Sequence, residues 1–212
     1  MNGNITIRNL TAQDIPAIKS MINEEWEWSS LVGTQEVLDA VLGLYLNQVL
    51  FESTFAKIAE AENEVVGVIF GCLDDAPPLF KTFLDNATEH ALVLLGAPEN
   101  ERKDIHEVMT GLNTTYKQLL HDKEGNYDGT LDFFIVSEKA QGLGIGKLLW
   151  NELKKYFAQN KARAVYVYTD TDCNFGFYEH AGFTRADTRR LSCNFTEFEW
   201  AVDVFLYEYI FS

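Results

Sequence analysis

The chain has few cysteines, few histidines and no long apolar run. Its three cysteines, Cys72, Cys173 and Cys193, are odd in number and far apart in 212 residues, which argues for reduced thiols rather than a disulfide framework. No Cys/His cluster has metal-ligand spacing, so we expect no metal site. No apolar run is long enough to span a membrane, and no basic segment followed by an apolar one opens the chain. These absences predict a cytoplasmic protein.

Positive charge is also scarce. Lysine and arginine number 17 against 32 aspartates and glutamates, so the formal net charge is −15. A chain this acidic should be repelled by nucleic-acid phosphates and by anionic lipids, so we expect no nucleic-acid partner and no membrane partner. The charge favours a cationic partner such as an amine, although acidity of this kind can equally serve solubility alone.

Hydrophobic periodicity predicts a mixed α/β fold. Strand patterns and helical stripes alternate along the chain, and no low-complexity linker divides it. We therefore expect residues 1–212 to form a single domain with a central sheet of about seven strands. The expected strands are 5–9, 54–61, 64–72, 131–136, 164–169, and roughly 184–194 and 198–211.

The segment from about 74 to 129 has a different pattern. Two helical stripes are separated by Gly96 and Pro98, which are typical of a helix end. A polar loop, 121–129, follows. We expect a helical hairpin inserted between the third and fourth strands, where it covers a pocket or mediates dimerisation.

The heptapeptide QGLGIGK (141–147) lies between the strand LDFFIV and a helical run. Glycines at such a junction let an anion reach the free amides at the start of a helix. A nucleotide P-loop needs Ser or Thr after Gly-Lys, but Leu148 follows Lys147. The dinucleotide fingerprint Gly-x-Gly-x-x-Gly fails too, because Lys147 or Leu149 occupies the last glycine position.

The pattern Gln141-x-x-Gly144-x-Gly146 resembles the pyrophosphate loop of the GNAT superfamily of N-acetyltransferases. Val136 lies five residues upstream, as in that family. A second signature of the family follows a strand about 30 residues on, and it is matched by Asn174, Phe177, Tyr178, Glu179, Gly182 and Phe183. The resemblance is close over about 130–185 and holds elsewhere only in outline. Residues 74–129 depart from it, because the family usually joins those two strands by a short turn.

The resemblance implies the GNAT fold, in which helices flank a mostly antiparallel sheet, and transfer of acetyl from acetyl-CoA to a primary amine by direct attack. It implies that loop amides hold the pyrophosphate, that two residues of the preceding strand pair with the pantetheine arm, and that Asn174 contacts that arm or the thiol. Asn174 is also suited to cap a helix. The implied cofactor-binding residues are Ile135, Val136, Gln141, Gly142, Leu143, Gly144, Ile145, Gly146, Lys147, Asn174 and Phe177.

Tyr178 is the candidate general acid. A thiol has a pKa of about 8.5 and tyrosine about 10, so a tyrosine hydroxyl beside the sulfur can protonate or stabilise the departing thiolate. A buried structural tyrosine is the alternative. Asp132, four residues before Val136, is the candidate general base, since family members often place an acid on this strand. Glu24, Glu25, Glu27 or a base acting through water are alternatives.

The acceptor and the oligomeric state stay open at this point. EEWEW (24–28) suits an aromatic, acidic pocket for a cationic amine, or a core tryptophan pair beside exposed glutamates. The amine can be a small molecule or belong to a protein, and dimers are frequent among similar proteins. One rival is a non-catalytic acyl-CoA-binding module with a protein partner; another is an enzyme that uses a longer acyl chain.

Overall fold

The structure is a computed structural model that describes residues 5–80 and 86–211. One sheet runs through this part of the chain, in the order β1-β2-β3-β4-β5-β7-β6. Its strands are β1 (Thr6–Asn9), β2 (Phe55–Ala61), β3 (Glu64–Leu73), β4 (Gly129–Val136), β5 (Ala164–Asp170), β6 (Thr184–Asn194) and β7 (Glu199–Ile210). The α-helices are α1 (Ile15–Trp26), α2 (Gln35–Glu52), α3 (Ala87–Gly96), α4 (Glu99–Leu120), α5 (Ile145–Gln159) and α6 (Gly176–His180).

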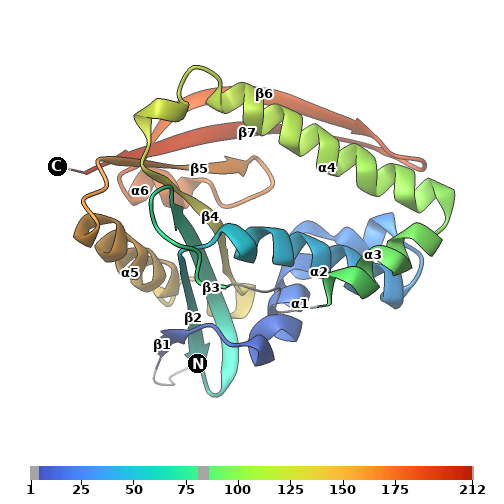
Figure 1. The fold of residues 1–212 in the computed structure, drawn as a ribbon, viewed down its shortest axis with the longest axis horizontal. Coiled ribbons are helices and arrows are strands. Elements are labelled where there is room, and N and C mark those ends of the chain that lie inside the picture. Colours follow the sequence, from blue (N-terminus) through green and yellow to red (C-terminus); the bar gives the residue numbers. More distant parts are fainter. Residues whose placement is uncertain (1–4, 81–85, 212) are drawn as a thin grey trace.

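Every neighbouring pair of strands is antiparallel except β4 and β5, which run parallel. The predicted mixed α/β fold with a mostly antiparallel, seven-stranded sheet is therefore confirmed. Helices cover both faces of the sheet (Figure 1). On one face α1 and α2 pack against β2, β3 and β4. On the other face α5 and α6 enclose a second core with the same sheet.

The two parallel strands diverge along their length. Their ladder has two register pairs, Gly129 with Val165 and Thr130 with Tyr166. At that end Asp128 closes the junction, since its backbone N–H donates to Ala164 O at 2.9 Å and its carboxylate accepts from Arg163 at 2.7 Å. Beyond Thr130 the edge of β4 that faces β5 has no strand partner among the described residues, so the sheet opens into a gap.

A bulge in β4 lies at the start of this gap. Opposite β4, Phe70 of β3 pairs with Phe133 and the next residue, Gly71, pairs with Leu131. Asp132 is therefore the extra residue, without a partner on β3. Bulges bend a strand and redirect a side chain, and here the redirected side chain is a carboxylate beside the gap.

The segment between β3 and β4 contains the two predicted helices, α3 and α4. The two helices pack against different elements. Helix α3 packs against α2, whereas α4 packs across β6 and β7 (Figure 1). The turn between them is short, because Ala97 and Pro98 alone separate the two helices. Residues 81–85 of the predicted insertion lie outside the described part of the chain.

Candidate active site

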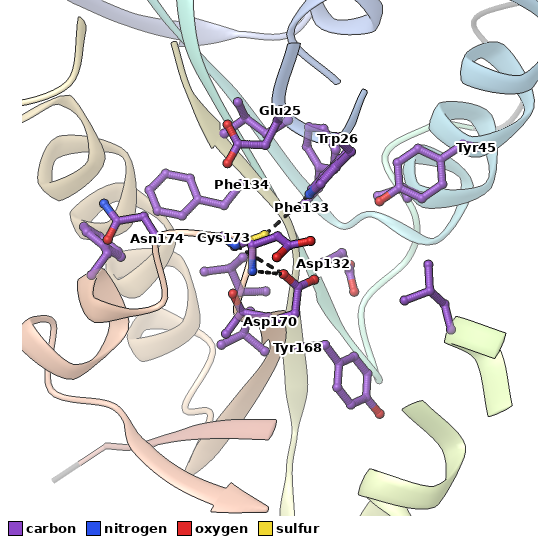
Figure 2. A pocket seen from close by; sticks show the side chains of 18 of the residues that line it. Glu25, Trp26, Tyr45, Asp132, Phe133, Phe134, Tyr168, Asp170, Cys173 and Asn174 are labelled. Carbon is purple, nitrogen blue, oxygen red and sulfur yellow. Dashed lines mark hydrogen bonds between the residues drawn. The ribbon is translucent and has the colours of Figure 1, made fainter. Parts of the chain in front are cut away.

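A cavity of about 1190 Å³ occupies the gap between β4 and β5. It extends from the first turn of α5, past the open edge of β4, to the space between α2, α4 and the β6–β7 hairpin. Figure 2 shows side chains from α1, α2, β4 and β5 around it. One continuous space thus connects the glycine loop with the opposite face of the sheet.

The glycine loop places free amides at the start of α5. Gly144 caps this helix with a φ of 77°, and Gly142 has a φ of 78°. Both values lie in the left-handed region that glycine adopts without strain. The Leu148 N–H donates to Gly144 O at 3.1 Å, so the amides of Ile145, Gly146 and Lys147 precede the helical hydrogen bonds. An anion can bind there, at the positive end of the helix dipole.

The loop residues do not all face the cavity in the same way. Gln141, Gly142, Gly144, Ile145, Gly146 and Lys147 line it. Leu143 does not: its side chain is 44 % exposed, and its amide donates to Ala140 O at 3.4 Å. Gly146 also lies close to Phe177, because a Cβ atom there would lie 3.2 Å from the Phe177 ring and would press against it.

The open edge of β4 forms one wall of the cavity. Val136 and Phe134 face it from β4, while the Ile135 side chain is buried in the core with α1 and α2. The other edge of this segment is bonded to β3, where Ile135 pairs with Val68 and Val136 with Gly67. An extended chain can therefore add along the free edge of β4 as a further strand would.

Asn174 and Phe177 lie on the far side of this wall. Phe177 packs edge-on against Phe134, with ring centroids 5.1 Å apart. Asn174 is exposed at the cavity, and α6 has no side-chain cap, since Phe175 occupies the N-cap position. The alternative role of Asn174 as a capping side chain is therefore not observed, and its amide group is free to meet a ligand.

Tyr178 lines the cavity from α6 and is 7 % exposed. Among the described residues, none forms a hydrogen bond with its hydroxyl. Burial, followed by the nearby Cys173, Asp170 and Glu25, raises the Tyr178 pKa well above its ordinary value. The hydroxyl is therefore protonated at neutral pH and available as a donor.

Asp132 lines the cavity with a carboxylate that has one oxygen without a hydrogen-bond partner among the described residues. That oxygen, Oδ2, is buried. Burial, with smaller contributions from the negative charges of Glu52 and Asp74, raises the Asp132 pKa to about 8. An unpaired polar atom of this kind is rare in folded proteins unless a ligand or water meets it. A base that titrates near neutral pH is also suited to accept a proton.

The cavity is strongly acidic. Six of its lining residues are carboxylates and two are lysines, Lys117 and Lys147. No described lysine or arginine forms an ion pair with any of the six. Burial raises the pKa of Asp170, and burial together with Glu138 and Asp170 raises the pKa of Glu25. The six are Glu25, Glu27, Glu52, Asp132, Asp170 and Asp172.

Comparison with known proteins identifies the fold and the family. The sequence model of the Acetyltransferase (GNAT) family matches residues 17–183, which is most of the chain. The chain belongs to the GNAT acetyltransferase family. It is therefore an acyltransferase, as its two sequence signatures predicted. No curated protein matches this acetyltransferase.

Solved structures of other GNAT proteins have the same fold. A ribosomal-protein-alanine N-acetyltransferase from Brucella melitensis is 16 % identical, with a TM-score of 0.52 over 97 % of this chain and 99 % of that chain. The PaiA N-acetyltransferase from Thermoplasma acidophilum, solved with coenzyme A, is 15 % identical, with a TM-score of 0.52 over 98 % and 99 %. An agmatine N-acetyltransferase mutant is 12 % identical, with a TM-score of 0.54 over 97 % and 99 %. Identities this low establish the fold alone.

Cys173 of this acetyltransferase lies in the cavity without the character of a nucleophile. Its Sγ accepts a hydrogen bond from Trp26 Nε1 at 3.4 Å. Burial and the adjacent Asp170 raise the pKa of the Cys173 thiol to about 12, so it is a thiol rather than a thiolate at neutral pH. Trp26 and Trp28 both line the cavity, and Trp28 is also a core residue that is 6 % exposed.

The sequence prediction missed several residues around the cavity. Asp170 ends the buried strand β5 and Asp172 lies two residues beyond it, and that position could have marked both as candidates. Tyr168 is half-buried on the same strand and lines the cavity. It stacks on Tyr116, which is 52 positions away in the chain, so the sequence does not reveal the pair. Among the proposed alternative bases, Glu25 and Glu27 line the cavity, and exposed Glu24 instead accepts a hydrogen bond from Ser20.

Within residues 5–80 and 86–211, no group of three or more histidine, cysteine or acidic side chains is arranged to hold a metal ion. In the same part of the chain, none of the helices combines the length and the apolar character required to cross a membrane.

Proposed function

We propose that this acetyltransferase moves the acetyl group of acetyl-CoA to a cationic primary amine by direct attack of the amine on the thioester. The observation that carries the proposal is one cavity that joins an anion-binding helix start to six carboxylates without a described lysine or arginine partner. One end suits a pyrophosphate and the other suits an ammonium group. The reacting atoms would meet in the gap between β4 and β5.

The residues of the cofactor side fit acetyl-CoA. The amides of the Gln141–Lys147 loop would hold the pyrophosphate, except that Leu143 contributes only if its weak bond to Ala140 opens. The backbone at Ile135 and Val136 would pair with the pantetheine amides along the free edge of β4. Asn174 would meet the arm or the sulfur, and Phe177 would pack along it.

The acceptor side fits a positively charged amine. Six carboxylates without a described cationic partner line the cavity. Three of them, Glu25, Asp132 and Asp170, are half-buried, and ionising acidic groups that lie so close together is costly unless a cation compensates them. Trp26 and Tyr45 add aromatic faces that attract cations. The names of the structural relatives leave the acceptor open, since one is named for agmatine and another for a ribosomal-protein alanine.

Asp132 is the proposed general base and Tyr178 the proposed general acid. An amine attacks only after it loses a proton, and the Asp132 carboxylate, with its unpaired Oδ2, would accept that proton directly or through water. The C–S bond of the thioester breaks as the C–N bond of the amide forms. The Tyr178 hydroxyl would then donate its hydrogen to the departing sulfur. Cys173 takes no covalent part, because it is held as a thiol.

The test is release of free CoA thiol from acetyl-CoA in the presence of a panel of primary amines, with the acetylated amine identified by mass spectrometry. The proposal predicts amine-dependent thiol release, fastest with cationic amines. Tight acetyl-CoA binding without thiol release for any amine would instead indicate a non-catalytic acyl-CoA-binding module. Faster turnover with a longer acyl-CoA would change the identity of the proposed acyl donor and leave the rest of the proposal intact.

Four expectations about the whole protein remain part of this proposal: a single domain over residues 1–212, a cytoplasmic location, the absence of nucleic-acid and membrane partners, and a possible homodimer. A net charge of −15 and three free cysteines support the location and the absence of polyanionic partners. Size-exclusion chromatography with light scattering would test the dimer.

A further inference from the structure

Helix α4 crosses the face of the sheet on which β4 and β5 diverge. Its N-terminal half contributes Ile105 and Val108 to the core that α1 and α2 form with β2, β3 and β4. Its C-terminal half contributes Leu119, which is fully buried against Leu191 and Val202 of the β6–β7 hairpin. The helix therefore joins the two halves of the sheet over the gap (Figure 1).

Contacts along its length fix α4 in this position. Tyr116 stacks on Tyr168 of β5 with ring centroids 4.2 Å apart and an interplanar angle of 7°. The Tyr168 hydroxyl also donates to Tyr116 O at 3.0 Å. In the N-terminal half of the helix, Asp104 Oδ1 accepts from the backbone and side chain of Thr196, both at 2.9 Å.

A glycine lets the helix approach the hairpin closely. A Cβ atom at Gly111 would lie 2.9 Å from the Leu191 side chain and 3.3 Å from the Cys193 sulfur, so a larger residue would force either that side chain or the helix to shift. Together with the tyrosine stack, this contact makes α4 a fixed wall rather than a loosely attached surface helix.

The inner side of α4 lines the acceptor end of the cavity. Tyr45 of α2 and the rings of the β6–β7 hairpin line the same cavity, as does Asp132. The lining near α4 is thus mostly apolar and aromatic, with the Asp132 carboxylate in the same space. The lining residues of α4 are Val108, Met109, Leu112, Asn113, Tyr116, Lys117 and Leu120.

We propose that α4 sets the size of the acceptor: the enzyme acetylates a slender small-molecule amine with an aliphatic chain and excludes amines of polypeptides. The proposal rests on the function above and narrows its substrate class. A polypeptide acceptor needs an open groove or a free sheet edge on which to lie, whereas α4 crosses the gap between β4 and β5 and lines the cavity there (Figure 1). Apolar walls instead favour a methylene chain, which gains about 0.8 kcal/mol, or about fourfold in kcat/KM, per buried CH₂.

The test measures kcat/KM for three kinds of primary amine at saturating acetyl-CoA: unbranched alkyl amines of increasing length, amines branched or arylated at the same chain, and a tripeptide with a free α-amine. In the native enzyme, kcat/KM should rise about fourfold per methylene over the first few members. The branched amines and the tripeptide should be poorer by about 100-fold or more, the loss typical of a group that forces apart a packed wall.

Tyr116→Ala removes the ring from the wall, and Tyr116→Phe keeps it. Tyr116→Ala should raise the ratio of kcat/KM for branched amines to kcat/KM for unbranched amines by about tenfold. Tyr116→Phe should retain the native ratio. Gln118→Ala, on the exposed side of α4, is the control and should match the native enzyme. If Tyr116→Ala melts far below the native enzyme, Met109→Ala tests the same wall two turns away.

The outcomes separate this inference from the function beneath it. Equal kcat/KM for the tripeptide and the alkyl amines, or a selectivity ratio unmoved in a folded Tyr116→Ala, would overturn the size limit while leaving the transferase intact. Binding of the amines to the enzyme–CoA complex, followed by calorimetry, gives a second measure. If no amine releases thiol but slender amines still bind better than branched ones, the transferase proposal fails and the size limit stands.

Discussion

The two ends of the cavity are built in different ways. The proposed cofactor end comes from short, nearly continuous stretches, namely β4 with the loop into α5, and the start of α6. The proposed acceptor end is assembled from α1, α2, α4, β5 and the β6–β7 hairpin, which are far apart in the chain. Binding a phosphate needs little more than backbone amides in one local conformation. Recognising an amine needs side chains from several elements, and an inserted helix can reshape that end without disturbing the other.

The two ends also differ in charge. The first turn of α5 offers a positive helix end and Lys147, whereas carboxylates dominate around Asp132 and Asp170. An anionic cofactor and a cationic acceptor would therefore approach from opposite ends and meet in the gap between β4 and β5. Changes at one end should alter the binding of one substrate only, and the following variants test that separation.

The largest effect is expected at the backbone of the cofactor end. Gly144→Val places a β-branched residue at a φ of 77° with open space around it, so its cost is conformational, about 1–2 kcal/mol. Losing one charge-assisted bond to phosphate adds about 1.5–3 kcal/mol. We expect acetyl-CoA affinity to fall about 1000-fold in calorimetry. Gly125→Val, also in open space but without a positive φ, should bind normally. Retained affinity in Gly144→Val would remove the loop from the cofactor site.

The next effect separates chemistry from binding at the acceptor end. Asp132→Asn keeps the shape of the side chain but cannot accept the amine proton, so kcat/KM for the amine should fall about 100-fold at neutral pH. The native rate should rise with pH through the Asp132 pKa of about 8, and this rise should be absent in the variant. Asp122→Asn, in an exposed loop, is the control. An unchanged pH profile in Asp132→Asn would point to another base.

The Asp132 carboxylate should also lower the free energy of unfolding at high pH. Burial, Glu52 and Asp74 raise the Asp132 pKa above its unfolded value, so the folded state binds a proton that the unfolded state releases. The associated stability is complete below about pH 4 and is lost as pH rises through about 8. Asp132→Asn should therefore have a higher melting temperature than the native enzyme at pH 9, and this difference should shrink towards pH 5. A difference in melting temperature that does not depend on pH would show that the carboxylate titrates normally.

Asp132 also shows where the sequence stopped being informative. The glycine loop and the segment from Asn174 to Tyr178 were predictable because their conformations depend on nearby residues. The bulge that turns Asp132 towards the gap depends on the register between β3 and β4, and a strand pattern does not specify register. The helices of the insertion were predictable from their stripes, but the stacking of Tyr116 on Tyr168 joins two elements through tertiary packing. The sequence therefore predicts the local structure of the proposed cofactor end better than that of the proposed acceptor end.

A smaller effect is expected where the two ends meet. Tyr178→Phe removes one hydroxyl from a site whose leaving group, a thiol with a pKa of about 8.5, already departs readily. We expect kcat to fall about 30-fold, below the usual range for general acids, with unchanged affinity for acetyl-CoA. Tyr156→Phe, on α5 against Phe55 and outside the cavity lining, is the matched control. If chemistry limits the rate and kcat is unchanged, Tyr178 is a structural residue.

The smallest effect concerns a flexible charge at the cofactor end. Lys147 follows the free amides of α5, and its side chain is exposed at the cavity. An ion pair with a solvated ammonium contributes little to binding, about 0.2–1 kcal/mol. Lys147→Met should therefore lower the affinity for acetyl-CoA about threefold at low salt. Salt screens such a pair, and the difference should vanish at about 0.5 M NaCl. Lys161→Met, two residues beyond the C-terminal end of α5, should show no difference at either salt concentration. A loss larger than about tenfold that persists in high salt would mean that Lys147, and not the backbone, provides most of the phosphate binding, and the contrast between a backbone-built and a side-chain-built end would no longer hold.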